Sequence, residues 1–92
     1  SGTNASGAGQ YGIYASRGSI INAYSSNISR AGKYGAASYF NSIINAMSSD
    51  ASNAGNYGFI VYGGSFICAE NATGTLYQTA NTLTAQGIIF KP

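Results

Sequence analysis

The sequence contains no histidine, one cysteine and few charged residues, and each shortage removes a class of function. Only 7% of the 92 residues are charged, and Asp50 and Glu70 are the two carboxylates. Without histidine the commonest general base is missing, and metal clusters of histidine and cysteine are excluded. Cys68 cannot form a disulfide within the chain, and we expect it to be buried as a small hydrophobic side chain. The sequence therefore predicts no catalytic residue, no metal site and no cofactor, and a chain that is not an enzyme by itself.

Clusters of positive charge and long apolar runs are also missing. The basic residues are scattered along the chain, at Arg17, Arg30, Lys33 and Lys91. No basic surface for nucleic acid can be drawn from them. No apolar run approaches the roughly 18 residues that a membrane-spanning helix needs. We therefore expect no nucleic-acid partner and no membrane span.

What the sequence does contain is a repeat of fixed length. The stretch GQYGIYASRGSIINAYSSNISRA, residues 9–31, is followed by GKYGAASYFNSIINAMSSDASNA, residues 32–54, with similar residues in the same order. A third unit, residues 55–77, keeps the scaffold and then drifts, and residues 1–8 match the end of a preceding unit. One constant offset relates Tyr11 to Tyr34 and Tyr57, Ile21 to Ile44 and Ile67, and Asn22 to Asn45. Three units without insertion or deletion indicate a repeat architecture.

The 23-residue period of these units fits one coil of a β-solenoid. Two-helix repeats need about 33 residues or more. Each unit holds three short strand candidates, in the first unit YGIYAS, SIINAYS and SNISRAG, with glycine, asparagine or serine at the corners. We predict an all-β fold, a β-helix-like solenoid of 23-residue coils over residues 1–75, followed by an exit or capping segment over residues 76–92. Equivalent residues of successive coils should then stack about 4.8 Å apart and form ladders. We expect an isoleucine ladder, a tyrosine ladder and a short asparagine ladder.

A helical interpretation of the repeat competes with this one. An apolar stripe of helical spacing runs through the second unit, formed by Phe40, Ile43, Ile44 and Met47. The stripe is complete in only one unit. The same windows are rich in glycine, serine and asparagine, which are poor helix formers. The repeat therefore favours strands.

Two segments are apolar on both faces if they are strands. In SIINA, Ile20 and Ile21 are adjacent and so point to opposite sides of a strand. In FIVY, residues 59–62, the apolar run is again continuous, whereas a strand buried on one side alternates apolar and polar residues. Three coils stack to only about 15 Å, which is too short a cylinder to cover the second face itself. We therefore expect another copy to cover it, and a homotrimer suits an elongated stack best.

The stretch GQYGIYASRGSIINAYSSNISRAGKYG resembles the repeats of phage tail fibres and tailspikes, which are rich in serine, alanine, glycine and asparagine. The resemblance covers residues 1 to about 75 and lies in the repeat, the composition and motifs such as YASRGS. No catalytic motif of a tailspike depolymerase is matched. The resemblance implies a homotrimer of β-helical or interwoven β-structure on the tail of a virion, assembled in the host cytoplasm and extracellular when it functions. It also implies a structural and host-attachment role, with bacterial surface polysaccharide as the partner.

Tyrosine is the abundant side chain best suited to this partner, because its ring can stack on a sugar. We expect Tyr11, Tyr34 and Tyr57 to form a structural ladder. The candidates for glycan contact are the less regular tyrosines, Tyr14, Tyr24 and Tyr39.

Two other functions stay open. The chain could be part of a β-helical polysaccharide depolymerase, with its site between subunits or elsewhere in a parent chain, or a stalk of a bacterial trimeric adhesin. Within one chain a paired-carboxylate glycosidase site is not expected, because Asp50 and Glu70 fall in different parts of the repeat.

Overall fold

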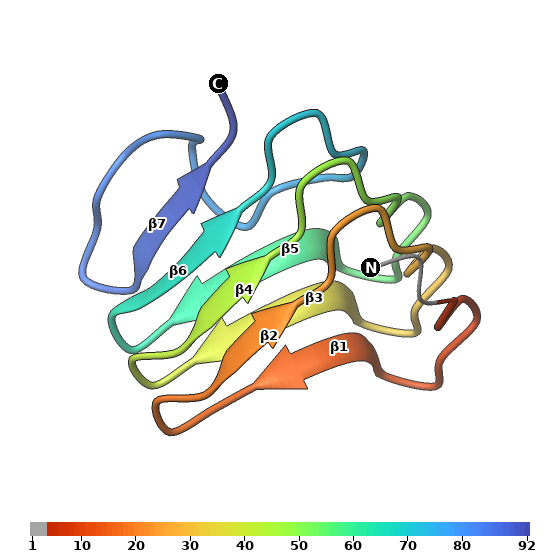
Figure 1. The fold of residues 1–92 in the computed structure, drawn as a ribbon, viewed down its shortest axis with the longest axis horizontal. Helices are drawn as coiled ribbons and strands as arrows, with labels where there is room; N and C mark the ends of the chain where they lie inside the picture. Colours follow the sequence, from red (N-terminus) through yellow and green to blue (C-terminus); the bar gives the residue numbers. More distant parts are fainter. Residues whose placement is uncertain (1–3) are drawn as a thin grey trace.

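The chain winds as a stack of coils, each lying on the one before (Figure 1). The computed structural model describes residues 4–92, so the first three residues of the expected partial unit 1–8 lie outside the described part. The strands are β1 (Tyr11–Ala15), β2 (Ile20–Asn22), β3 (Tyr34–Tyr39), β4 (Ile43–Asn45), β5 (Tyr57–Tyr62), β6 (Ser65–Cys68) and β7 (Gly87–Phe90). They pair in parallel to form two sheets, β1-β3-β5 and β2-β4-β6-β7. On a third face, a row of parallel bridges joins Asn4, Asn27, Asp50 and Thr73.

The register of both sheets confirms the all-β solenoid with coils about 23 residues apart. Tyr11 pairs with Tyr34 in one sheet, and Ile21 pairs with Ile44 in the other. None of the described residues is helical. Within the apolar stripe of helical spacing, Phe40 and the following Asn41 have φ angles of 54° and 61°. These left-handed conformations interrupt any right-handed helix, so the helical interpretation was wrong.

Left-handed backbone conformations recur at the corners of the coils. Four columns of residues with positive φ follow the repeat: Arg17, Phe40 and Gly63; Gly18, Asn41 and Gly64; Ser25, Ser48 and Asn71; Gly7, Arg30 and Asn53. Glycine and asparagine adopt this conformation most readily, and they hold about half of these positions. At the others the neighbouring coil fixes the corner, as where the Ser25 N–H donates to the Met47 carbonyl at 2.8 Å.

Asparagine recurs before the corners because its side chain closes the turn. The Oδ1 atoms of Asn22, Asn27, Asn45 and Asp50 each accept a hydrogen bond from the N–H two residues later, at 3.0–3.2 Å. This is the geometry of an Asx-turn. The predicted asparagine ladder is also present, but its bond from Asn45 Nδ2 to Asn22 Oδ1 is long, at 3.5 Å. Turn closure is therefore the main role of these asparagines, and stacking is secondary.

Serine fills another corner column, between the two sheets. The Ser19 N–H donates to Ser42 Oγ at 3.2 Å, and the Ser42 N–H donates to Ser65 Oγ at 3.2 Å. Ser42 and Ser65 are buried, so the Ser65 hydroxyl gives the Ser42 N–H a hydrogen-bond partner in place of water. Short neutral side chains therefore provide hydrogen bonds to backbone N–H groups at the corners of successive coils.

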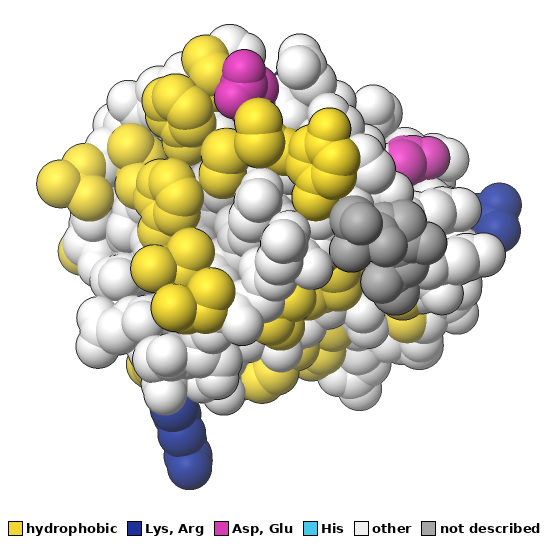
Figure 2. Space-filling view, viewed as in Figure 1, with side chains coloured by type: hydrophobic (Ala, Val, Ile, Leu, Met, Phe, Trp, Pro, Cys, Tyr) yellow, Lys and Arg dark blue, Asp and Glu magenta, His cyan; other side chains and the backbone are white. Residues whose placement is uncertain are grey.

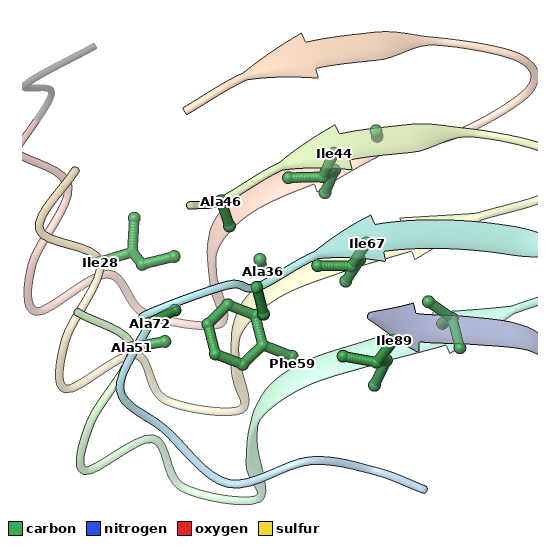
Figure 3. Packing of buried hydrophobic residues seen from close by; sticks show 12 residues of the cluster. Ile28, Ala36, Ile44, Ala46, Ala51, Phe59, Ile67, Ala72 and Ile89 are labelled. Carbon is green, nitrogen blue, oxygen red and sulfur yellow. The ribbon is translucent and has the colours of Figure 1, made fainter. Parts of the chain in front are cut away.

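The interior is a thin layer of aliphatic ladders between the faces (Figure 3). Ile44, Ile67 and Ile89 are fully buried and stand in register on β4, β6 and β7. From the other sheet, Phe59 lies opposite Ala36 of the coil below, and Figure 3 shows its ring beside that small side chain. The predicted isoleucine ladder is confirmed, and Ile89 adds a further member to it.

Residues 76–92 continue the stack in a less regular way. Leu76 pairs with Phe59, and the Tyr77 N–H donates to the Phe59 carbonyl at 2.9 Å. After a loop, β7 pairs with β6 with Ile89 opposite Ile67, an offset that is shorter by one than the period of the repeat. In the loop, Gln78 Nε2 donates to the Gly87 carbonyl at 2.8 Å. The segment thus forms an incomplete further coil.

The chain itself covers the outer face of the β1-β3-β5 sheet. Ala37 and Ile60 alternate with core residues along β3 and β5 and so point outward, yet both are buried, with Ile60 only 4% exposed. Tyrosines flank these two positions along the strands. The expectation that another copy must cover FIVY was therefore wrong, because the side chains of the same chain bury Ile60.

The outer face of the β2-β4-β6-β7 sheet is open. Ile20 is 75% exposed and Ile43 is 42% exposed, and the two are paired in register. Cys68 also lies on this side and is partly exposed rather than buried as expected. The alternation along β6 places Ile67 in the core and turns Cys68 outward. For SIINA, cover by another copy stays a prediction.

We expect Ile44→Ala to destabilise the fold, because Ile44 is fully buried between two other isoleucines of the ladder. The cavity should lower the free energy of unfolding by about 2–5 kcal/mol per chain. Asp50→Asn is the control, because Asn27 closes the equivalent turn one coil earlier. Its effect should stay within about 0.5 kcal/mol. Denaturant unfolding measures both, and similar losses in the two variants would contradict the ladder.

Gly35→Ala should also destabilise the chain, because Gly35 lies where two coils approach closely. A Cβ there would lie 2.6 Å from the Ala51 Cβ and 2.7 Å from the Gly58 carbonyl oxygen. We expect a loss of about 1–3 kcal/mol, since backbone must move to admit the methyl group. At Gly9 no atom lies within 4 Å of an added Cβ, so Gly9→Ala is the matched control and should be neutral or slightly stabilising. Thermal unfolding with equal midpoints for the two variants would show that the coils do not constrain Gly35.

Candidate functional site

The outer face of the β1-β3-β5 sheet carries tyrosines because each strand bends near its start. In β1, a Cβ on Gly12 would lie 2.9 Å from the Ile28 Cβ, so Gly12 faces the interior. The next residue, Ile13, also packs against the core. Two successive inward positions break the alternation of a regular strand. Tyr11 and Tyr14, on either side of them, both lie outside, with ring centroids 4.9 Å apart.

The rings on this side form one connected group, which we call the tyrosine face. Its members are Tyr11, Tyr14, Tyr34, Tyr39, Phe40 and Tyr62. Centroids of contacting rings are 4.9–5.9 Å apart. Tyr11 stacks on Tyr34 with 22° between the planes, whereas Phe40 meets Tyr62 edge to face at 83°. Both are preferred arrangements of aromatic pairs, so the rings hold one another in place.

The tyrosine face is exposed without being hollowed. Tyr14 is 45% exposed, and Phe40 and Tyr62 are exposed to a similar extent. No pocket was found among residues 4–92. A ligand on this face would therefore lie along its surface, against ring faces and tyrosine hydroxyls, instead of entering a cavity.

The three tyrosines predicted for glycan contact do not all lie together. Tyr14 and Tyr39 are neighbours in the tyrosine face, with centroids 5.3 Å apart. Tyr24 follows β2 at another corner and is in none of the ring pairs of the described residues. Sequence reasoning missed Tyr62, which stands one full repeat after Tyr39 and pairs with it in register. The constant offset between repeats, applied to Tyr39, could have identified Tyr62 as a candidate.

The predicted structural ladder of tyrosines is present, and it overlaps with the candidate site. Tyr11, Tyr34 and Tyr57 pair in register along the sheet. Tyr11 and Tyr34 belong to the tyrosine face, and Tyr57 meets Tyr77 edge to face at 5.6 Å. Tyr11 and Tyr34 thus have both a structural role in the ladder and a candidate role in binding.

The two carboxylates lie apart. Asp50 is on the third face, where it bridges Asn27 and Thr73, and Glu70 follows β6. Hydrogen bonds from the Ser52 hydroxyl and N–H lower the pKa of Asp50, and Arg30 contributes in the same direction. Asp50 is therefore an ionised turn-closing group. Within the part of the chain that the structure describes, no three histidine, cysteine or acidic side chains are grouped as metal ligands.

Comparisons of the chain with protein-family models, with curated proteins and with solved structures found no match. The described residues include no helix of the length and hydropathy that a bilayer crossing requires.

Tyr39 has the most perturbed ionisation in the tyrosine face. Burial, together with the charges that Tyr11, Tyr34 and Tyr14 would carry, raises the pKa of Tyr39 from 10.0 to about 12. The folded chain thus disfavours ionised Tyr39, whereas the unfolded chain ionises it at its ordinary pKa. The contribution of Tyr39 to stability is complete below pH 10 and is lost as the pH rises from 10 to about 12.

Replacing Tyr39 with phenylalanine should remove this dependence. In a titration followed by tyrosinate absorbance, we expect a final step near pH 12 in the wild type and none in Tyr39→Phe. The free energy of unfolding of the wild type should fall more steeply above pH 10 than that of the variant. If the final step persists in Tyr39→Phe, the cluster does not bury the Tyr39 hydroxyl.

Proposed function

We propose that this chain is a structural and host-attachment segment of a bacteriophage tail fibre or tailspike, and that it holds bacterial surface polysaccharide on the tyrosine face. The connected group of half-exposed rings carries the proposal. The resemblance of the repeat to tail-fibre sequences supports the assignment to a bacteriophage tail. In this proposal the chain is assembled in the host cytoplasm and is extracellular, on the tail of a virion, when it functions.

The chemistry of the tyrosine face suits a sugar polymer. A tyrosine ring offers an apolar surface to the C–H groups of a sugar, and its hydroxyl donates and accepts hydrogen bonds. Contacts such as that of Tyr39 with Tyr62, at 5.4 Å, hold the rings in place before any ligand binds. Little side-chain freedom is then lost on binding. A polymer suits a face without a pocket, because it gains contacts over several rings.

Assembly as a homotrimer is part of the proposal. The exposed Ile20 and Ile43 lie on the other sheet, so self-association there leaves the tyrosine face free. Three copies side by side would present three tyrosine faces to one bacterial surface. Several weak glycan contacts then combine into strong attachment, because each further contact is intramolecular.

Attachment without cleavage is the activity that the charged residues favour. Glycoside hydrolysis commonly uses two carboxyl groups that flank the scissile bond. In this chain Asp50 is held as a turn-closing group on the third face, and Glu70 follows β6 of a different sheet. Neither residue belongs to the tyrosine face.

The binding experiment screens an array of bacterial capsular and O-antigen polysaccharides and then titrates the chain with a short oligosaccharide of the best one. We expect Tyr14→Ala to weaken oligosaccharide binding about 5- to 30-fold, which corresponds to the loss of one or two kcal/mol of ring contact. A similar loss is expected for Tyr62→Ala.

Tyr24→Ala is the matched control, because Tyr24 is 44% exposed, close to the exposure of Tyr14, but lies outside the tyrosine face. It should bind as the wild type does. Equal losses in Tyr14→Ala and Tyr24→Ala, or binding to no polysaccharide, would contradict the proposal. Release of new reducing ends during the incubation would favour the depolymerase instead.

A further inference from the structure

The outer side of the β2-β4-β6-β7 sheet is an apolar surface, which we call the aliphatic face. Its apolar members are the outward residues of the four strands, Ile20, Ile43, Phe66, Cys68, Ile88 and Phe90. The four residues Ile20, Ile43, Phe66 and Ile88 form one outward ladder, opposite in direction to the buried isoleucine ladder. Figure 2 shows hydrophobic side chains gathered on the side of the molecule where β6 and β7 lie in Figure 1.

Charge is nearly absent from the aliphatic face. Arg17 precedes β2 in a turn, Lys33 precedes β3, and Arg30 and Asp50 belong to the third face. Glu70 and Lys91 stand at the margin: Glu70 is two residues beyond Cys68, and Lys91 directly follows Phe90 at the end of β7. The Lys and Arg side chains that are visible in Figure 2 lie at the periphery of the view. A neutral apolar face gives no electrostatic attraction to a charged partner and is complementary to a face like itself.

The aliphatic face is about as large as the largest apolar patch of a typical monomeric protein, and such patches are often functional. Ile20, Ile43 and Phe90 contribute most of its exposed surface, and the six apolar residues together expose on the order of a few hundred Å². The largest apolar patch on a monomeric protein is about 300–600 Å², and a stable interface buries about 800 Å² per partner. The apolar residues alone fall short of that area, so an interface here would also bury Asn22 and Asn45, which stand in the same outward column as Cys68.

We infer that a second copy of this chain covers the aliphatic face, and that the copies of the homotrimer meet there. Successive residues of each ladder are about 4.8 Å apart, and the ladders of a second copy have the same spacing. Around a threefold axis the aliphatic faces of three copies turn inward, and each face buries part of its surface against the other two. The inference rests on the homotrimer of the proposed function and adds which of the three faces meets the partner.

The test is sedimentation equilibrium of the whole 92-residue chain over a range of concentrations. Ile20→Asn removes the most exposed member of the ladder, and at 75% exposure Ile20 contributes little to folding. We expect its self-association to weaken about tenfold or more per interface. Leu83→Asn is the control: Leu83 is 77% exposed but lies in the loop before β7, outside both sheets. It should leave the assembly unchanged, and circular dichroism checks that both variants fold.

Cys68 supplies an independent readout, because it is free and lies on the aliphatic face. Oxidation of the wild type with copper phenanthroline should join two copies through their Cys68 thiols. The control is the double variant Cys68→Ser with Lys33→Cys, which moves the thiol to the start of the other sheet. This variant should not crosslink.

The outcomes separate this inference from the proposed function. A wild-type trimer that Ile20→Asn dissociates and Leu83→Asn does not supports the aliphatic face as the interface. Equal association of wild type and Ile20→Asn overturns the inference and leaves the homotrimer standing. A wild type that is monomeric at every concentration overturns the inference and the homotrimer together. Glycan binding, measured with a short oligosaccharide, needs one copy only and is decided separately by the tyrosine variants.

Discussion

Parallel hydrogen bonding between successive coils is the interaction on which the rest of the structure depends. It places equivalent residues of successive repeats directly above one another in both sheets. Like charges directly opposite in a sheet are destabilising, so a charge repeated with this period would repel its own copies. Neutral asparagine and serine avoid that repulsion and still supply the turns and buried corners with hydrogen bonds. The low charge content is thus a consequence of the stacking.

The thin interior decides which side chains turn outward. Gly12 and Gly35 have neighbouring coils so close that no side chain fits inside, and the strands bend there. That bend brings Tyr11 and Tyr14 to the same outer surface. In this sheet the large Phe59 enters the core directly above the small Ala36. The requirement for small residues inside and the collection of tyrosines outside therefore have one cause.

Sequence reasoning could predict the features that follow from the period. The solenoid, the isoleucine ladder and the pairing of Tyr11 with Tyr34 all follow from the constant offset between repeats. Features that depend on how neighbouring side chains pack were missed. Ile60 is covered by its own chain, and the bend at Gly12 gathers tyrosines that a regular strand would separate. Strand β7 was missed because it joins the sheet at an offset shorter than the period, with Ile89 opposite Ile67.

The constant separation between paired residues has a consequence for how the chain folds. Every regular coil closes a loop of the same length, so the loop-closure entropy lost is nearly the same for each. Each coil also gains a similar set of hydrogen bonds and ladder contacts from the coil already formed. Once two coils have paired, folding can advance along the chain as a front, with one activation step per coil. A solenoid of this kind can therefore be lengthened by whole units without a new folding nucleus.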